Sequence, residues 1–135
     1  LEQIKDTDLK RARSNDFEGD CGNIIKFAFD DAATSEKFQA LLKADGIFCE
    51  RPIKTGKHVC WAWEILFRHK GALNDKMNPY LMEANQGLRM DYDRDMCPQS
   101  RENLSRQCYF SINPDWNKQD MDAIITKLQN AAKQL

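Results

Sequence analysis

His58 and Cys60 are the two residues of this chain whose types and spacing best suit chemistry. Side chains two positions apart on a strand share a face, so an imidazole and a thiol there could act as base and nucleophile or as two metal ligands. No second pair of ligands is near in the sequence, and His69 falls on a different expected element. The pattern therefore favours His58 as a polar contact in a cleft, with an ordinary exposed histidine as the alternative.

Three further side chains could line such a cleft. Tryptophan combines a large apolar surface with one hydrogen-bond donor, so Trp61 and Trp63 suit a ligand pocket or, more commonly, a core. Arg106 comes directly before an expected strand, where its guanidinium could clamp an anion. Together with His58 these residues could line a polar cleft, but they do not form a complete set of catalytic groups.

Two other motifs imitate known sites and fail at a required position. Residues 91–102 have the acidic spacing of a calcium loop, but Met96 stands where that loop needs a glycine for its sharp turn. Residues 54–57 resemble the end of a phosphate-binding loop, but Arg51 stands where the first glycine would be. We expect neither a metal site nor a nucleotide site from these stretches.

The elements that must position the cleft alternate between strands and helices, and they predict an α/β (α+β) two-layer sandwich. We expect a loose helix over 1–13, a buried strand over 24–29, a helix from Thr34 or Ser35 to Gly46, a strand over 47–51, a short aromatic-rich helix over 61–67, a turn or helix at Pro79, loop over 88–97, a helical turn from Pro98, a strand over 107–112, and a final helix capped by Asn117.

Composition limits the classes of function. With 135 residues and 41% hydrophobic content, the chain is expected to form a single domain, and a net charge of -1 gives no electrostatic case for nucleic acid or an anionic membrane. Five cysteines without a Cys-x-x-Cys pair argue against a disulfide framework and a zinc knuckle, so we expect a reducing cytoplasm.

No stretch approaches the ~18 apolar residues of a membrane span. Because the chain begins at Leu1 within an expected helix, we expect it to be a piece of a longer protein.

Three blocks, residues 38–58, 97–112 and 116–135, resemble the C-terminal small domain of fold-type I, pyridoxal-phosphate-dependent aminotransferases. The DegT/StrS group of sugar aminotransferases is the most similar family. Within this family, the 8-amino-3,8-dideoxy-octulosonate transaminase type is the most similar. Three features carry that resemblance: the Gly-Asp-Cys-Gly loop at 19–22, the tryptophans that follow His58 and Val59, and residues 104–106, which come directly before the expected strand.

The resemblance implies a small antiparallel or mixed sheet with helices on one face, in residues 1–135 as one small domain of a longer, homodimeric, cytoplasmic enzyme. That enzyme would transfer an amino group from an amino acid such as glutamate to a keto-sugar or aldehyde sugar acid, a reaction of polysaccharide biosynthesis. Pyridoxal 5'-phosphate and the catalytic residues would belong mainly to a large domain, with no catalytic residue in this chain. His58, Arg106 and Trp61 would face the cleft.

The chain departs from the family pattern in two places. Val59-Cys60-Trp61 follows His58 where the family usually has tyrosine and then proline, and residues 70–96 match the family poorly. Two other interpretations therefore stay open. One is a non-catalytic module that binds a ligand or a protein. The other is the small domain of an amino-acid transaminase, in which Arg106 would hold the α-carboxylate.

Overall fold

A three-stranded antiparallel sheet forms the centre of the chain in a computed structural model, which describes residue 4 and residues 7–16, 18–57, 59–71 and 73–135. The strands are β1 (Lys10–Arg11), β2 (Ile24–Ala28) and β3 (Gln107–Ser111), and they lie in the order β1-β2-β3. In the β2–β3 ladder Phe27 lies opposite Cys108 and Ile25 lies opposite Phe110. Because strand side chains alternate between faces, these four point to one side and form the floor of the core.

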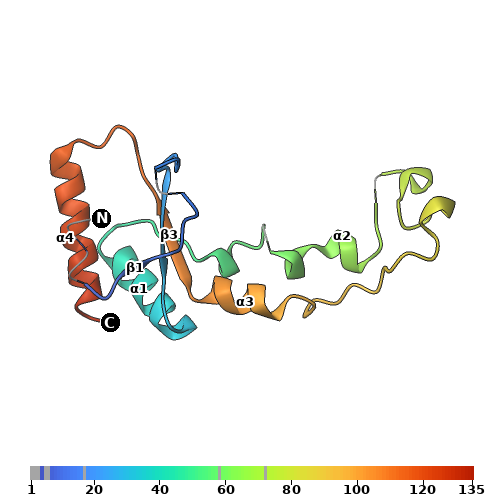
Figure 1. The fold of residues 1–135 in the computed structure, drawn as a ribbon, viewed down its shortest axis with the longest axis horizontal. Coiled ribbons are helices and arrows are strands. Elements are labelled where there is room, and N and C mark those ends of the chain that lie inside the picture. The colour runs from blue at the N-terminus through green and yellow to red at the C-terminus, as the bar shows by residue number, and fades with distance from the viewer. Residues whose placement is uncertain (1–3, 5–6, 17, 58, 72) are drawn as a thin grey trace.

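Helices α1 (Ala32–Ala44) and α4 (Lys118–Ala132) cover that apolar face, and Figure 1 shows both on the same side of the strands. Phe38 and Leu42 of α1 and Leu128 of α4 are buried against the sheet residues. Phe38 meets Phe27 edge to face, with ring centroids 5.6 Å apart. The predicted two-layer α+β arrangement, with an antiparallel sheet and helices on one face, is confirmed.

Helix α1 begins three residues earlier than a cap at Thr34 would place it. Asp31 has extended backbone and its side chain accepts a hydrogen bond of 2.7 Å from the Thr34 backbone, which also lowers the pKa of Asp31. Ser35, the other predicted cap, is fully buried, and its hydroxyl donates to the Gln107 carbonyl at 3.1 Å. The cap prediction was wrong because Ser35 instead joins α1 to β3.

The C-terminal end of α1 is closed as predicted. Gly46 has a φ of +78°, the left-handed conformation that glycine adopts without a steric cost. Its N–H donates to the Lys43 carbonyl at 3.1 Å, and the Ile47 N–H donates to the Leu42 carbonyl at 2.8 Å. These two bonds form a Schellman motif, which turns the chain away from α1 and toward the segment that follows.

Asn117 caps helix α4 as predicted, and it does so as part of a capping box. The Asn117 side chain accepts from the Asp120 backbone N–H, and the Asp120 carboxylate accepts from the Asn117 backbone N–H, each at 3.1 Å. Both bonds satisfy donors that the first helical turn would otherwise leave without partners.

Replacing Asn117 by alanine should therefore lower the free energy of unfolding by about 1 kcal/mol, because one side of the capping box is lost. Urea unfolding followed by circular dichroism would measure the change. Gln119→Ala, an exposed substitution in the same turn, serves as the control and should leave the midpoint nearly unchanged. Equal midpoints for the two variants would contradict the role of the cap.

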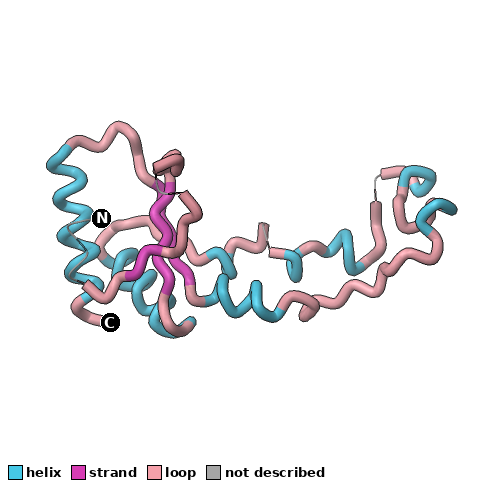
Figure 2. Tube along the Cα trace, in the orientation of Figure 1, coloured by secondary structure: helices cyan, strands magenta, loops and turns pink. Residues whose placement is uncertain are grey.

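Residues 52–105 leave the body as a long arm, which Figures 1 and 2 show extending away from the sheet and returning to it. The arm contains α2 (Glu64–Phe67), α3 (Pro98–Ser105) and the short 3-10 helices η2 (Pro52–Lys54), η3 (Cys60–Ala62), η4 (Asp75–Met77) and η5 (Glu83–Asn85). The predicted helices around Trp61 and from Pro98 are confirmed, as is the irregular stretch 88–97.

Two predicted elements differ in the structure. Residues 10 and 11 form strand β1 instead of continuing a helix from residue 1, because the edge of β2 offers hydrogen bonds, such as the 2.8 Å bond from the Ala12 N–H to the Lys26 carbonyl. The stretch 47–51 is extended, but it pairs with β3 only through a single bridge between Glu50 and Tyr109. Pro52 and the turn into η2 end the pairing there.

Candidate functional site

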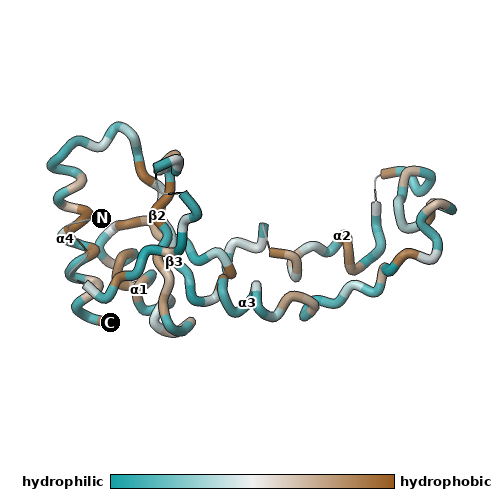
Figure 3. The backbone as a smooth tube through the Cα atoms, viewed as in Figure 1, coloured by the Kyte–Doolittle hydropathy of each residue, from teal (hydrophilic) through white to brown (hydrophobic). Residues whose placement is uncertain are grey.

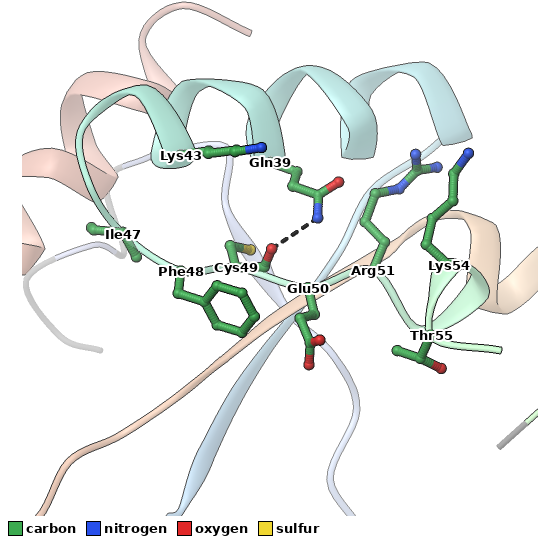
Figure 4. Close-up of a pocket in the computed structure, with 9 residues that line it drawn as sticks. All are labelled: Gln39, Lys43, Ile47, Phe48, Cys49, Glu50, Arg51, Lys54 and Thr55. Carbon is green, nitrogen blue, oxygen red and sulfur yellow. Dashed lines mark hydrogen bonds between the residues drawn. The ribbon is translucent and has the colours of Figure 1, made fainter. Parts of the chain in front are cut away.

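A shallow cleft of about 230 Å³ lies where the arm joins the body, between α1 and residues 47–55. Figure 4 shows its lining, with Gln39 and Lys43 on α1 and Phe48, Glu50 and Lys54 on the facing segment. The Gln39 amide donates to the Cys49 carbonyl at 2.8 Å, which holds the two walls together. The cleft thus has an ammonium group toward each end, from Lys43 and Lys54, with the Glu50 carboxylate and the exposed Phe48 ring between them (Figure 4).

Arg51 is the central structural residue of this junction. Its side chain is only 3% exposed, and Nη2 donates to the Ala32 carbonyl at 3.2 Å and to the Ser105 carbonyl at 2.9 Å. Nη1 lies 3.3 Å from a Glu36 carboxylate oxygen. One guanidinium therefore connects the start of α1, the end of α3 and the segment that enters the arm, a role that its several fixed donors permit.

Glu50 and Tyr109 close the base of the arm. Their backbones exchange two hydrogen bonds of 2.8 Å each, and the Tyr109 hydroxyl donates to the Glu50 carboxylate at 2.7 Å. That hydrogen bond, followed by burial, raises the pKa of Tyr109 to about 12. The pair lies on the sheet face that α1 and α4 leave uncovered, because Tyr109 alternates with the inward-facing Cys108 and Phe110.

The raised pKa gives a pH-dependent prediction. Since the folded Tyr109 holds its proton more tightly than an unfolded tyrosine, its contribution to stability is complete below pH ~10 and is lost as the pH rises to about 12. Ultraviolet titration of the tyrosines should resolve one late-ionising phenol. Glu50→Gln should return that phenol to the ordinary range, and an unchanged titration curve in this variant would contradict the assignment.

Two buried thiols face each other behind the cleft. The Sγ atoms of Cys49 and Cys108 lie 3.0 Å apart, and both side chains are buried. The hydrogen bond between the two thiols raises the pKa of Cys49 and lowers that of Cys108. The Arg51 charge and the Ser35 hydroxyl also lower the pKa of Cys108. Cys108 is therefore the better nucleophile of the pair.

Trp61 and Trp63 lie on the arm, outside the core in which such residues are more common. The Arg101 guanidinium lies over the Trp61 ring, 5.0 Å from its centroid, and Arg94 Nη1 donates to the Trp61 carbonyl at 2.8 Å. Trp63 is exposed, and its indole N–H donates to the Lys57 carbonyl at 3.3 Å. Stacking of arginine on Trp61 thus joins the two halves of the arm.

The structure does not group the predicted cleft residues around one point. Arg106 lies at the end of α3, and its Nη2 donates to the Asn103 side chain at 3.0 Å and lies 3.9 Å from Glu102. Trp61 contacts Arg101 on the other side of the arm. His58 lies outside the described residues.

Arg51 and the Cys49–Cys108 pair were missed at the sequence level. Arg51 was considered only as a defect in a phosphate-loop motif, and five cysteines without close spacing gave no reason to pair any two of them. One signal was present. Cys49 and Cys60 are separated by the same number of residues as Cys97 and Cys108, as expected for two cysteine pairs across antiparallel segments.

Large apolar side chains are exposed along the arm, and Figure 3 shows hydrophobic stretches there as well as in the body. Toward the far end, Leu73, Met77, Leu81 and Leu88 are each at least 60% exposed. In the same part of the chain, the ring of His69 stacks on Tyr80 with centroids 4.9 Å apart. An apolar surface on a projecting element is typical of a surface that another protein surface covers.

A scan against protein-family models finds no match for the chain, and a search of curated proteins finds no significant relative. Among the residues that the structure describes, no group of three or more histidine, cysteine or acidic side chains is arranged to hold a metal ion. Within the same ranges, each helix lacks either the length or the apolar character needed to cross a bilayer.

Proposed function

We propose that the chain is the small domain of a pyridoxal-phosphate-dependent sugar aminotransferase of the DegT/StrS type. The full-length enzyme transfers an amino group from an amino acid such as glutamate to a keto-sugar or aldehyde sugar acid, in the cytoplasm and as a homodimer. The observation that carries the proposal is the arm, which extends away from the body (Figure 1) and contains Trp61 in its outgoing half. A small sheet with helices on one face is compatible with such a domain.

The described lysines do not fit the cofactor on their own. A Schiff-base lysine needs a desolvated pocket that favours its neutral amine. Lys43 and Lys54 are exposed at an open cleft, and the Lys127 ammonium donates to the Asp45 carbonyl at 2.7 Å. The proposal therefore places pyridoxal phosphate, which supplies the electron sink for amino transfer, on a further domain of the full-length protein.

In this proposal, the residues of the present chain bind and enclose the substrate. The arm covers the cleft of the cofactor-binding domain and excludes water, with Trp61 as an apolar wall held in place by Arg101. Arg106 and His58 are the proposed polar contacts to the substrate. Arg106 has a planar guanidinium that suits a sugar-acid carboxylate, and rotation away from Asn103 would free it for that contact.

The visible absorption spectrum of the full-length protein tests the proposal. A yellow absorption band that bleaches on addition of glutamate is expected, because bound pyridoxal phosphate would supply the amino-transfer chemistry. Trp61→Phe should keep the band and weaken sugar turnover, and Trp63→Phe is the matched control on the same segment. A protein that stays colourless with added pyridoxal phosphate would overturn the enzyme proposal.

A non-catalytic protein-binding module is the second candidate, and the exposed apolar side chains of the arm favour it. Such a module would show no cofactor band but would bury the arm in a complex. A third candidate, the small domain of an amino-acid transaminase, differs in the amino acceptor. In that case Arg106→Ala should weaken turnover of keto acids while leaving the yellow absorption band unchanged.

A further inference from the structure

Four of the five cysteines form two facing pairs across the antiparallel halves of the chain. Cys49 and Cys108 meet at the base of the arm, with their Sγ atoms 3.0 Å apart. Farther along the arm, Cys60 and Cys97 lie on its two facing halves, beside the stack of Arg101 on Trp61 that joins these halves. All five residues are thiols in this structure, and the fifth, Cys21, is exposed beside Asn23.

The two pairs belong to one geometric arrangement. The outgoing segment contains Cys49 and Cys60, and the returning segment contains Cys97 and Cys108 at the same separation. Contacts between the pairs keep this register, since Arg101 lies over Trp61 and the Arg51 guanidinium donates to the Ser105 carbonyl. A disulfide needs sulfur atoms ~2 Å apart on neighbouring segments, so the Cys49 and Cys108 sulfurs need to approach by only about 1 Å.

We propose that the arm is a thiol–disulfide modification site, in which Cys49–Cys108 and Cys60–Cys97 become two intrachain disulfides in the presence of a small-molecule disulfide such as oxidised glutathione, while Cys21 stays a free thiol. The two disulfides cross-link the outgoing and returning segments of the arm. This inference is independent of the proposed enzymatic function, because it requires neither cofactor nor substrate.

The half-buried pair reacts in the folded chain, because the solvent reaches it. The hydrogen bond to Cys60 and then burial raise the pKa of Cys97, which therefore keeps its proton while the Cys60 thiolate attacks one sulfur of the oxidant. The disulfide of the oxidant breaks and one glutathione thiolate leaves and takes up a proton. Cys97 then loses its proton to water and attacks Cys60, releasing the second glutathione. Two protein thiols are oxidised by two electrons, and one glutathione disulfide is reduced to two thiols.

The buried pair follows the same balanced exchange during folding, before the core closes over it. One thiol of the pair attacks the oxidant as its thiolate, and the other then attacks the mixed disulfide and releases the second glutathione. Once both bridges are formed, the unfolded chain is constrained by a long loop and a shorter one within it. This constraint stabilises the folded form relative to the reduced chain.

Peptide mapping provides a direct test, and the sequence makes it unambiguous. The reduced, unfolded chain is refolded in a buffer of reduced and oxidised glutathione, free thiols are alkylated, and trypsin digestion is followed by mass spectrometry without reductant. Trypsin cuts at Lys54 and Lys57, which lie between Cys49 and Cys60 in the sequence. It also cuts at Arg101 and Arg106, which lie between Cys97 and Cys108. Each of the three possible pairings of four cysteines therefore gives different linked peptides.

We expect linked peptides joining Cys49 to Cys108 and Cys60 to Cys97, with alkylated Cys21, and a Tm roughly 5–10 °C above that of the reduced chain. Cys21→Ser should change none of these results. Cys60→Ser, on the exposed arm, should remove only the outer bridge and keep the Cys49–Cys108 peptide. Either alternative pairing, a bridge that includes Cys21, only one of the two bridges, or glutathione adducts alone would overturn the proposal.

Discussion

Replacing Phe27 by alanine is expected to lower the free energy of unfolding by about 3–5 kcal/mol, the range for a phenyl ring removed from a closed core. Phe27 is 0% exposed and lies at the meeting point of the sheet and α1. Its ring centroid is 5.6 Å from that of Phe38 and 6.2 Å from that of Phe110, so its loss leaves a cavity between the two layers. Neighbouring rings on rigid elements cannot move enough to fill that cavity.

The exposed Phe48 provides a matched control for this experiment. Its side chain is 79% exposed at the cleft, so Phe48→Ala removes the same atoms without opening a cavity in the core. We expect a change within about 0.5 kcal/mol for this variant. Urea unfolding of both variants, monitored by tryptophan fluorescence and circular dichroism, measures the difference. Similar losses from the two substitutions would show that the core is not where the structure places it.

Replacing Arg51 by alanine should cost about 2–4 kcal/mol, although Arg51 is a polar residue. The substitution leaves the carbonyls of Ala32 and Ser105 without their donors and separates the arm from α1. The ion pair with Glu36 contributes little to this loss, because the Glu36 side chain is 67% exposed and well hydrated.

Two further variants separate these contributions. Glu36→Gln removes the ion pair alone and should change stability by less than about 1 kcal/mol. Arg51→Lys keeps the charge but lacks the planar set of donors, so it should recover only part of the loss. Thermal unfolding of the three proteins side by side provides the comparison. A loss for Glu36→Gln as large as that for Arg51→Ala would mean that charge, not the two carbonyl contacts, holds the junction together.

The elements predicted correctly from sequence are those that local patterns determine. The apolar run of β2, the alternation in β3, the glycine at the end of α1 and the asparagine cap of α4 each depend on residues only a few positions apart. The arm was not predicted, because its halves have no hydrophobic period. Contacts such as Arg101 with Trp61 and Arg94 with Glu64 join residues far apart in the sequence, and only the folded chain reveals them.

The candidate site was predicted only in part, for a related reason. The expected end of a helix at Gly46 agrees with the Schellman motif that closes α1, and the cleft lies beside it. Arg51 was not recognised, because its importance comes from two carbonyl groups that carry no side-chain signal. The order of motifs along the chain placed Arg106 and Trp61 in one cleft. In the structure Arg106 contacts Asn103, whereas Trp61 contacts Arg101.

The bridge between Glu50 and Tyr109 has a consequence for the evolution of this chain. Because Glu50 and Tyr109 join the two ends of the arm at its base, the folded body already includes the entropic cost of closing one long loop. The entropic cost of closing a loop grows only logarithmically, so doubling its length adds just about 0.6 kcal/mol. Insertions and deletions between residues 52 and 105 are therefore nearly neutral for the stability of the body. This region can change its length and its exposed residues while the sheet and its two covering helices stay the same.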